Sequence, residues 1–328
     1  MSATDQIQLL SDASLIAVEA QFDDCDGSGE ATTGWDLDFC QLERGKLNAE
    51  LTAVFGSNLT VQHVRFSHAI HQRGTAPVGT ITLGLPDDMR FLNWFTRQHE
   101  NDRQLLNFSR ADGYDSMSAA GFSGLTFSVP SATFQRAVAA LTGDVSATPD
   151  LVSATSFDIR ASEARRLRVL AQGLVGVSKR PGANQSASSE LEEDIIHTLA
   201  RLTLKTVSAE VCTSFSSRQR AVDRALELID LQPSILAISE LHTAANVSSA
   251  TLNRGFKERF GVSPKQYLVA RRLCQARRCI QSSGDWQQIS SVAYDFGFWH
   301  LGRFASDYRS MFGELPSETR LRAKKPGQ

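Results

Sequence analysis

The chain has 328 residues, of which 34 are Lys or Arg, 36 are Asp or Glu, and 41% are hydrophobic. This balance is typical of a globular protein with two or three domains and excludes a disordered or fibrous chain. No apolar run approaches the roughly 20 residues that a membrane span needs, and the start lacks signal-peptide features, so we expect a cytoplasmic protein with no membrane partner.

Residues 1–155 are predicted to form a β-rich domain. Short stretches of alternating apolar and polar residues are separated by Gly-rich or Asp-rich breaks, a pattern typical of a barrel or sandwich. A helix is expected at Ser131–Leu141, with Ser131 as its N-cap. Little periodicity is visible before about residue 20. The predicted strands are Leu37–Leu42, Lys46–Phe55, Thr60–Phe66, Gly79–Leu85, Gln104–Phe108 and Gly124–Val129.

This β-rich domain is the expected site of a small-molecule effector, because barrels and sandwiches commonly enclose ligand cavities. Aromatic rings can pack on an apolar ligand or contact a cation, and a histidine can hydrogen-bond a ligand. The candidate effector contacts are Phe66, His68, Trp94 and Phe95.

A metal site is not expected among the clustered histidines. If the segment is a strand, His63 and His71 share one face and His68 points to the other, so the three do not converge on one ion. The sequence also shows no P-loop, no GxGxxG and no nucleophile elbow. We therefore expect no metal, no cofactor and no enzymatic activity.

Residues 156–217 are predicted to form a helical linker that serves in dimerisation, which makes a homodimer the expected assembly. Helices are expected at Glu163–Val177 and Glu190–Ala209. Between them, Lys179–Ser189 is rich in small and turn-forming residues and is predicted to be a loop.

The last third of the chain is basic. Residues 218–328 contain 17 Lys or Arg and 10 Asp or Glu, so the rest of the chain is acidic. Such a split favours a nucleic-acid-binding module attached to a non-binding body. We expect an all-α domain at residues 218–322 and a basic tail at 323–328.

A first helix-turn-helix unit is predicted within residues 238–260. Ile238–Ala245 forms a short helix, Asn246 can adopt the left-handed conformation that ends it, and Ser248 is a good N-cap for the next helix. In that second helix the apolar residues recur every four positions, which predicts a buried stripe. The stripe consists of Leu252, Phe256 and Phe260, and the opposite face shows Ala250, Asn253, Arg254 and Lys257.

A second unit with the same spacing follows at Ile289–Phe312. Ala293 is the small residue where its two helices meet, and Gly297 supplies the turn. Between the units, Pro264–Ser282 is predicted to be a helix capped by Ser263. The repeated aromatic stripe is Phe304, Tyr308 and Phe312, and the exposed face carries Leu301, Gly302, Ala305, Ser306 and Arg309.

These features resemble the DNA-binding domain of the AraC/XylS family of bacterial transcription regulators. The resemblance covers about residues 218–322 and includes LNRGFKERFGVSPKQYLVARRL (252–273) and VAYDFGFWHLGRFASDYRSMFGELPSETR (292–320). The second segment looks especially like regulators of the ethanolamine-operon type, and QLERGKLNAELTAVF (41–55) resembles their sensor region. The resemblance implies a cupin-like sensor domain, promoter DNA and RNA polymerase as partners, and a small amine or amino alcohol as effector.

The resemblance also implies that two recognition helices enter successive major grooves. The base-reading positions of the family fall on Ala250, Asn253 and Arg254 in the first unit and on Leu301, Gly302 and Ser306 in the second. Lys257, His300, Arg303 and Arg309 are expected to grip phosphates. Two positions depart from the family pattern: Ser306 stands where arginine is common, and His242 where alanine is common. We therefore expect the first unit to carry most of the hydrogen-bonded base readout.

The combined prediction is an α+β protein that acts as a ligand-responsive, sequence-specific transcription activator. Two alternatives stay open at this stage. One is a metal-dependent barrel enzyme with an appended DNA-binding domain. The other is a DNA-binding protein that responds to no effector.

Overall fold

A computed structural model describes residues 15–24, 34–95, 104–180 apart from 148, 150, 152 and 153, 185–205, 217–231, 236–282 and 287–323. The predicted fold class is confirmed: the N-terminal part is built on antiparallel sheets and the C-terminal part is helical. The cupin-like description of the sheets stays a prediction. None of the described helices is long and apolar enough to cross a membrane.

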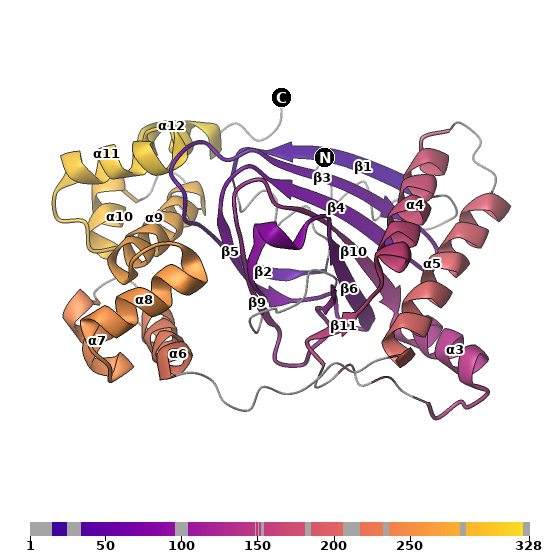
Figure 1. The fold of residues 1–328 in the computed structure, drawn as a ribbon. Helices are drawn as coiled ribbons and strands as arrows, with labels where there is room; N and C mark the ends of the chain where they lie inside the picture. The colour runs from indigo at the N-terminus through magenta and orange to yellow at the C-terminus, as the bar shows by residue number, and fades with distance from the viewer. Residues whose placement is uncertain are drawn as a thin grey trace.

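Within the described residues, the larger sheet has seven strands in the order β1-β3-β4-β10-β6-β8-β11, all antiparallel. Its outer face is covered by three helices, α3 (Ser131–Thr142), α4 (Ala161–Ser178) and α5 (Gln185–Lys205), as Figure 1 shows. The strands are β1 (Ile16–Phe22), β3 (Ala49–Phe55), β4 (Thr60–Phe66), β6 (Thr80–Pro86), β8 (Gln104–Asn107), β10 (Ser123–Pro130) and β11 (Ser156–Asp158).

The smaller sheet has four strands among the described residues, in the order β2-β5-β9-β7. One of its faces lies over the larger sheet, and the other is covered by the C-terminal helices (Figure 1). The sheet is therefore a single layer between the sandwich interior and the C-terminal domain. Its strands are β2 (Asp36–Gln41), β5 (Ile70–Thr75), β7 (Leu92–Phe95) and β9 (Tyr114–Ser118).

The C-terminal domain is arranged around one long helix, α9 (Pro264–Ser282), which contacts both helix-turn-helix units. Ser263 and Gln266 form a reciprocal cap at its start: Ser263 N–H donates to Gln266 Oε1 at 2.9 Å, and Gln266 N–H donates to Ser263 Oγ at 3.3 Å. The remaining helices are α6 (Ser217–Leu231), α7 (Ile238–Ala245), α8 (Ser249–Phe260), α10 (Ile289–Asp295), α11 (Leu301–Phe312) and α12 (Pro316–Ala323).

Two local predictions need correction. Helix α5 begins at Gln185, so part of the predicted Lys179–Ser189 loop is helical; Ser188 is buried, and packing overrides the weak helix propensity of serine there. The helix predicted at Ser131–Leu141 starts at Ser131, but Pro130 occupies the N-cap position. The Ser131 hydroxyl instead donates to the Gly79 carbonyl at 2.9 Å, which ties the helix to the sheet.

Candidate functional site

Two local features build the turn between α7 and α8, and a third feature, within α8, sets how closely α6 packs. Asn246 has a φ of 49°, a left-handed conformation that ends α7. The Ser248 hydroxyl accepts a hydrogen bond from Thr251 N–H at 3.2 Å and caps α8. Gly255 lets α6 approach α8, because a Cβ at that position would lie 2.7 Å from Val222. These features set the angle at which α8 leaves the turn.

The predicted face of α8 lies at the surface. Leu252, Phe256 and Phe260 are buried against α9, which orients the other side of the helix outward. Ala250, Arg254 and Lys257 are exposed, and their spacing of four and then three residues places them on one face. Asn253 is half-buried, and its side-chain amide donates to the Ser249 carbonyl at 2.9 Å, so base contact by Asn253 requires that this bond break.

The second unit has the same construction with a different turn. Gly297 has a φ of 77°, and Phe298 N–H donates to the Ala293 carbonyl at 2.8 Å, which closes the end of α10. Phe304, Tyr308 and Phe312 are buried, as the four-residue spacing predicts.

The exposed residues of α11 lie on one outward face, on its flank and at the start of the helix. Gly302, Ser306 and Arg309 are exposed and share one face by their spacing. Arg303 lies on the flank: it pairs with Asp307 at 3.7 Å and borders a groove toward the β-rich domain. His300 and Leu301 are exposed at the start of the helix.

The domain contact uses basic residues that the charge count assigns to the DNA-binding module. Arg271 and Arg278 on α9 both bind Asp38 on β2, at 2.7 Å for Arg271 Nη1 and 2.8 Å for Arg278 Nη1. Burial by itself would raise the pKa of Asp38, but hydrogen bonds and charge from Arg271 and Arg278 outweigh burial and hold that pKa well below its ordinary value. On α6, Asp230 binds Arg73 of β5 at 2.7 Å.

A buried polar network completes this contact. Tyr267 of α9 hydrogen-bonds His71 Nδ1 at 2.8 Å, and His71 Nε2 lies 3.3 Å from Asp115 of β9. Arg259, at the end of α8, pairs with Asp115 at 2.9 Å and with Asp223 at 2.6 Å. Burial lowers the pKa of His71, and the charge of Asp115 opposes burial only in part. Helix α8 is thus tied to the smaller sheet through Arg259.

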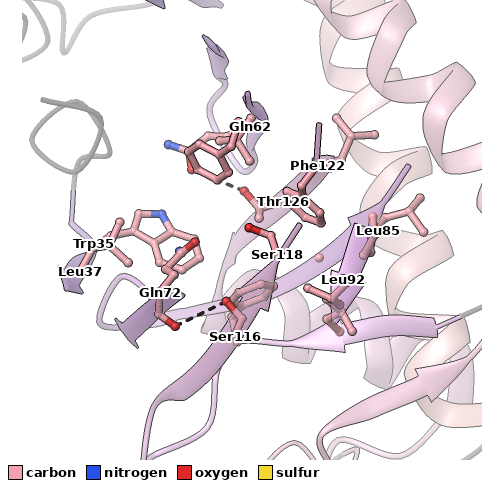
Figure 2. Close-up of a pocket in the computed structure, with 18 of the residues that line it drawn as sticks. Trp35, Leu37, Gln62, Gln72, Leu85, Leu92, Ser116, Ser118, Phe122 and Thr126 are labelled. Atoms are coloured by element: carbon pink, nitrogen blue, oxygen red, sulfur yellow. Dashed lines mark hydrogen bonds between the residues drawn. The ribbon is translucent and has the colours of Figure 1, made fainter. Parts of the chain in front are cut away.

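A cavity lies between the two sheets, and Figure 2 shows its lining. Including its opening to solvent, the space measures about 710 Å³. Gln62 and Thr126 share a hydrogen bond at 3.4 Å, and Ser116 Oγ donates to the Gln72 carbonyl at 3.5 Å. The apolar lining includes Trp35, Leu37, Phe39, Val64, Phe66, Leu85, Leu92, Leu106, Phe108, Phe122 and Leu125.

The predicted effector contacts do not all meet at this cavity. Phe66 lines it and stacks on Phe122 with ring centroids 6.4 Å apart. His68, in the turn after β4, is not among the lining residues. It hydrogen-bonds Ser67 at 2.8 Å and packs against Gly45, which lies between β2 and β3. The side chains of Trp94 and Phe95 lie outside the described part of the structure.

The three clustered histidines also diverge. His63 pairs with Asp87 at 2.8 Å on the outer side of the larger sheet, His68 lies in a turn, and His71 is buried in the domain contact. No group of three or more His, Cys, Asp or Glu side chains that could hold a metal ion occurs among the described residues.

Sequence reasoning did not identify the carboxylates that hold the two domains together. Asp38 and Asp115 lie on strands, and only the pairing of β2, β5 and β9 brings them opposite α8 and α9. The sequence carries no signal that singles out Asp38, because Asp36 and Asp38 fall on the same, polar side of the alternating strand DLDFCQ.

Comparisons with known proteins agree with the helical geometry. Residues 241–322 match a family model described as a helix-turn-helix domain. An XylDLEGF operon transcriptional activator of Pseudomonas putida is 38% identical over 122 residues, which are 36% of this chain and 37% of that protein. An XylDLEGF operon transcriptional activator 2 of the same species is 35% identical over 125 residues, 37% of this chain and 79% of that protein.

One solved structure with a similar sequence is described as a probable AraC family transcriptional regulator from Rhodopseudomonas palustris. It is 34% identical and the alignment covers 31% of this chain and 96% of that chain, with a TM-score of 0.30. The chain therefore spans little more than a third of the length of the first curated relative, and the similarity lies in the helical third that carries both units.

Proposed function

Because the chain belongs to the AraC/XylS family of transcriptional regulators, we propose that it is a sequence-specific DNA-binding activator whose β-rich domain binds a small effector. The observation that carries the proposal is the pair of helices α8 and α11. Each has one buried stripe and one exposed face, and both are held by α9. Helix pairs of this kind place the second helix in a major groove.

The two exposed faces suit different parts of DNA. Arg254 can make bidentate hydrogen bonds to guanine, and Lys257 can neutralise a phosphate. Gly302 and Ser306 offer little hydrogen bonding by comparison, so the second unit supplies placement, shape and apolar contacts. His300, Arg303 and Arg309 are proposed phosphate contacts, and Arg303 must leave Asp307 to reach one. Asn253 is a proposed reader whose amide must first leave the Ser249 carbonyl.

The DNA-binding proposal is tested by selection. The full chain is used to enrich duplexes from a random library, and the selected duplexes are measured against scrambled ones by fluorescence anisotropy. The proposal predicts one enriched motif with two parts about one helical turn apart. Equal affinity for selected and scrambled duplexes would overturn it and leave a sequence-independent DNA-binding protein.

The lining of the cavity indicates the effector class. Among the described residues, its polar side-chain groups are the indole N–H of Trp35 and the side chains of Gln62, Gln72, Ser116, Ser118 and Thr126, and none of them is ionisable. A protonated amine would lose its hydration there without gaining a carboxylate partner, which is costly. We propose a neutral, largely apolar effector with one or two hydrogen-bonding groups. It replaces the small amine implied by the resemblance to ethanolamine-type regulators, a subgroup that the comparisons do not support.

Coupling between the cavity and the DNA-binding domain is supported by the alternation of side chains in the smaller sheet. On β5, Gln72 lines the cavity and its neighbour His71 binds α9. On β9, Ser116 lines the cavity and its neighbour Asp115 binds Arg259 of α8. A ligand that moves these strands therefore acts on the residues that hold the DNA-binding domain. Such an effector changes DNA affinity only through differing affinity for the two states.

Three molecules of one shape test the effector class: cyclohexylmethanol, cyclohexylmethylamine and cyclohexanecarboxylate. We expect the alcohol to raise the melting temperature of the full chain, and the two charged molecules to raise it less. A larger shift with the amine than with the alcohol would contradict the proposed class. Gln72→Leu, which is close to Gln72 in size and removes an amide that also hydrogen-bonds the buried Tyr114 hydroxyl, is expected to reduce the shift with the alcohol.

Two partners complete the proposal. The first is RNA polymerase, which a transcription activator contacts. The second is another copy of this chain, which we propose binds through α4 and α5. Val169 of α4 and Leu204 of α5 support a dimer contact, because both are apolar and are 59% and 37% exposed. We propose that the protein acts in the cytoplasm, where promoter DNA lies. Sedimentation of the full chain is expected to give a dimer, and a monomer at micromolar concentration would contradict that part of the proposal.

A further inference from the structure

Three large aromatic or apolar side chains are exposed between the end of α10 and the start of α11, the second recognition helix. Trp299 and Tyr294 stack with ring centroids 6.0 Å apart and 28° between the ring planes. Trp299 is 68% exposed, Tyr294 43% and Leu301 39%. These three residues are called the apolar patch below. Large apolar side chains that gather at a surface mark a contact with a partner more often than isolated ones do.

The surroundings of the patch favour DNA as that partner. Leu301 is the first residue of α11, the helix whose Gly302, Ser306 and Arg309 face outward. His300 and Arg303 are exposed next to the patch, and residues 218–328 carry an excess of basic over acidic side chains. Leu301 therefore adjoins Gly302 of the proposed DNA-binding face, and the C-terminal domain as a whole, though not Asp295 beside Tyr294, has the basic excess that suits phosphates.

The chemistry of the patch complements what α11 lacks. The face formed by Gly302 and Ser306 has a single hydroxyl with which to discriminate bases. In the major groove, thymine differs from the other bases by its C5-methyl group, which apolar side chains recognise. Trp299 adds a large flat surface and an indole N–H that can donate to a phosphate oxygen.

We propose that Leu301 reads a thymine methyl group in the major groove and that the stacked pair Tyr294 and Trp299 packs against the adjoining sugar-phosphate backbone. This inference rests on the proposed DNA-binding function and names the chemistry by which its second unit reads sequence. It makes thymine, rather than guanine or adenine, the base that the second unit prefers.

Deoxyuridine substitution tests the inference directly, since it removes only the methyl group. In a duplex enriched from a random library with the full chain, each thymine is replaced in turn by deoxyuridine, and affinity is measured by anisotropy. We expect the unsubstituted protein to lose about fourfold in affinity at one or two positions in one half of the site. Leu301→Ala is expected to show no further loss at those same positions.

Trp299→Ala is expected to weaken binding to thymine and deoxyuridine duplexes alike, by about tenfold. Trp299→Phe, which keeps an aromatic surface, is expected to recover most of that loss. The matched control is Leu231→Ala on α6, because Leu231 is 78% exposed and apolar but lies outside both units. Its affinity is expected to equal that of the unsubstituted protein.

The outcomes separate this inference from the proposed function. If no motif is enriched, the proposed function fails. Two results would overturn only the inference about the patch, provided that a motif is enriched. One is an unchanged affinity for every deoxyuridine duplex, and the other is an equal loss of affinity in Leu301→Ala and in the unsubstituted protein. Wild-type affinity in Trp299→Ala would likewise overturn the role of the aromatic pair.

Discussion

Arg254 and Lys257 lie one turn apart on the exposed face of α8, and their chemistry differs. The planar guanidinium of Arg254 suits two acceptors on one guanine edge, whereas the ammonium of Lys257 suits a phosphate oxygen. We expect Arg254→Ala to lose about 1–3 kcal/mol and to relax preference at one base pair. Lys257→Ala should weaken all duplexes alike and reduce the salt slope by about one.

Anisotropy titrations over a salt series, with single-base variants of the selected duplex, check this pair. Lys257→Ala is the control for loss of charge, and Arg254→Ala for loss of base contact. Identical behaviour of the two variants would show that the face of α8 is wrongly assigned.

His71 carries a prediction about pH. In the folded protein, burial lowers the pKa of His71 below its ordinary value of 6.5. The unfolded chain therefore takes up the proton at a higher pH than the folded protein does. Stability from this group is therefore complete above about pH 6.5 and is lost as the pH falls through that value. The loss is up to about 1.4 kcal/mol for each pH unit.

Urea unfolding of the full chain at pH 7.5 and 5.5 measures this effect. We expect His71→Gln, which keeps a donor and an acceptor but does not titrate, to lose less stability between the two pH values than the unsubstituted protein. His68→Gln, a change in the turn after β4, is the control. An equal loss in the unsubstituted protein and His71→Gln would contradict a neutral buried His71.

At the scale of secondary-structure elements, the α7–α8 turn offers a matched test. Ser248 caps α8, whereas its neighbour Ser249 is an exposed residue in the first turn of that helix. Ser248→Ala is expected to cost about 1 kcal/mol of stability and to weaken DNA binding, because the start of α8 frays. Ser249→Ala is expected to stay within about 0.5 kcal/mol. Calorimetric melting of both variants checks this, and equal losses would remove the cap from the account.

Elements with strong periodicity and clear caps could be predicted from the sequence. The strand Thr60–Phe66 and the first helix of the first unit, Ile238–Ala245, agree with the structure at both ends. The missed strands are β1, β5, β7, β9 and β11, and several lack the alternation that marks a half-buried strand. In β5 both His71 and Gln72 point to partners, one in each layer, so neither face is apolar.

The candidate site was predicted unevenly for the same reason. The exposed residues of α8 and α11 follow from helical spacing, which is a local property. The roles of Arg259, Arg271 and Arg277 do not follow from helical spacing, because each is buried and paired with a carboxylate distant in sequence. Part of the basic excess in the last third therefore attaches this domain to the acidic β-rich domain, besides the side chains that we propose contact DNA.

On the scale of the whole molecule, one β-sheet separates the cavity from the DNA-binding domain (Figure 1). Asp38 is the carboxylate that both Arg271 and Arg278 bind across this contact. Asp38→Asn leaves the buried Arg271 with Asp230, 3.8 Å away, as its remaining carboxylate, and we expect a loss of about 2–3 kcal/mol. Hydrogen exchange should speed up in α9 and β2 together.

Asp36→Asn is the matched control for Asp38→Asn, since Asp36 lies on the same strand and is exposed. It is expected to leave both stability and exchange unchanged. Unchanged exchange in Asp38→Asn would show that this ion pair does not hold the domains together.

The central claim, that both units of one chain occupy DNA together, is tested most directly by hydroxyl-radical footprinting of the full chain on its selected duplex. We expect two protected stretches on one face of the duplex, about one helical turn apart for each bound chain. Arg254→Ala should weaken protection in one stretch and Trp299→Ala in the other. A single protected stretch, or uniform protection along the duplex, would contradict binding by both units.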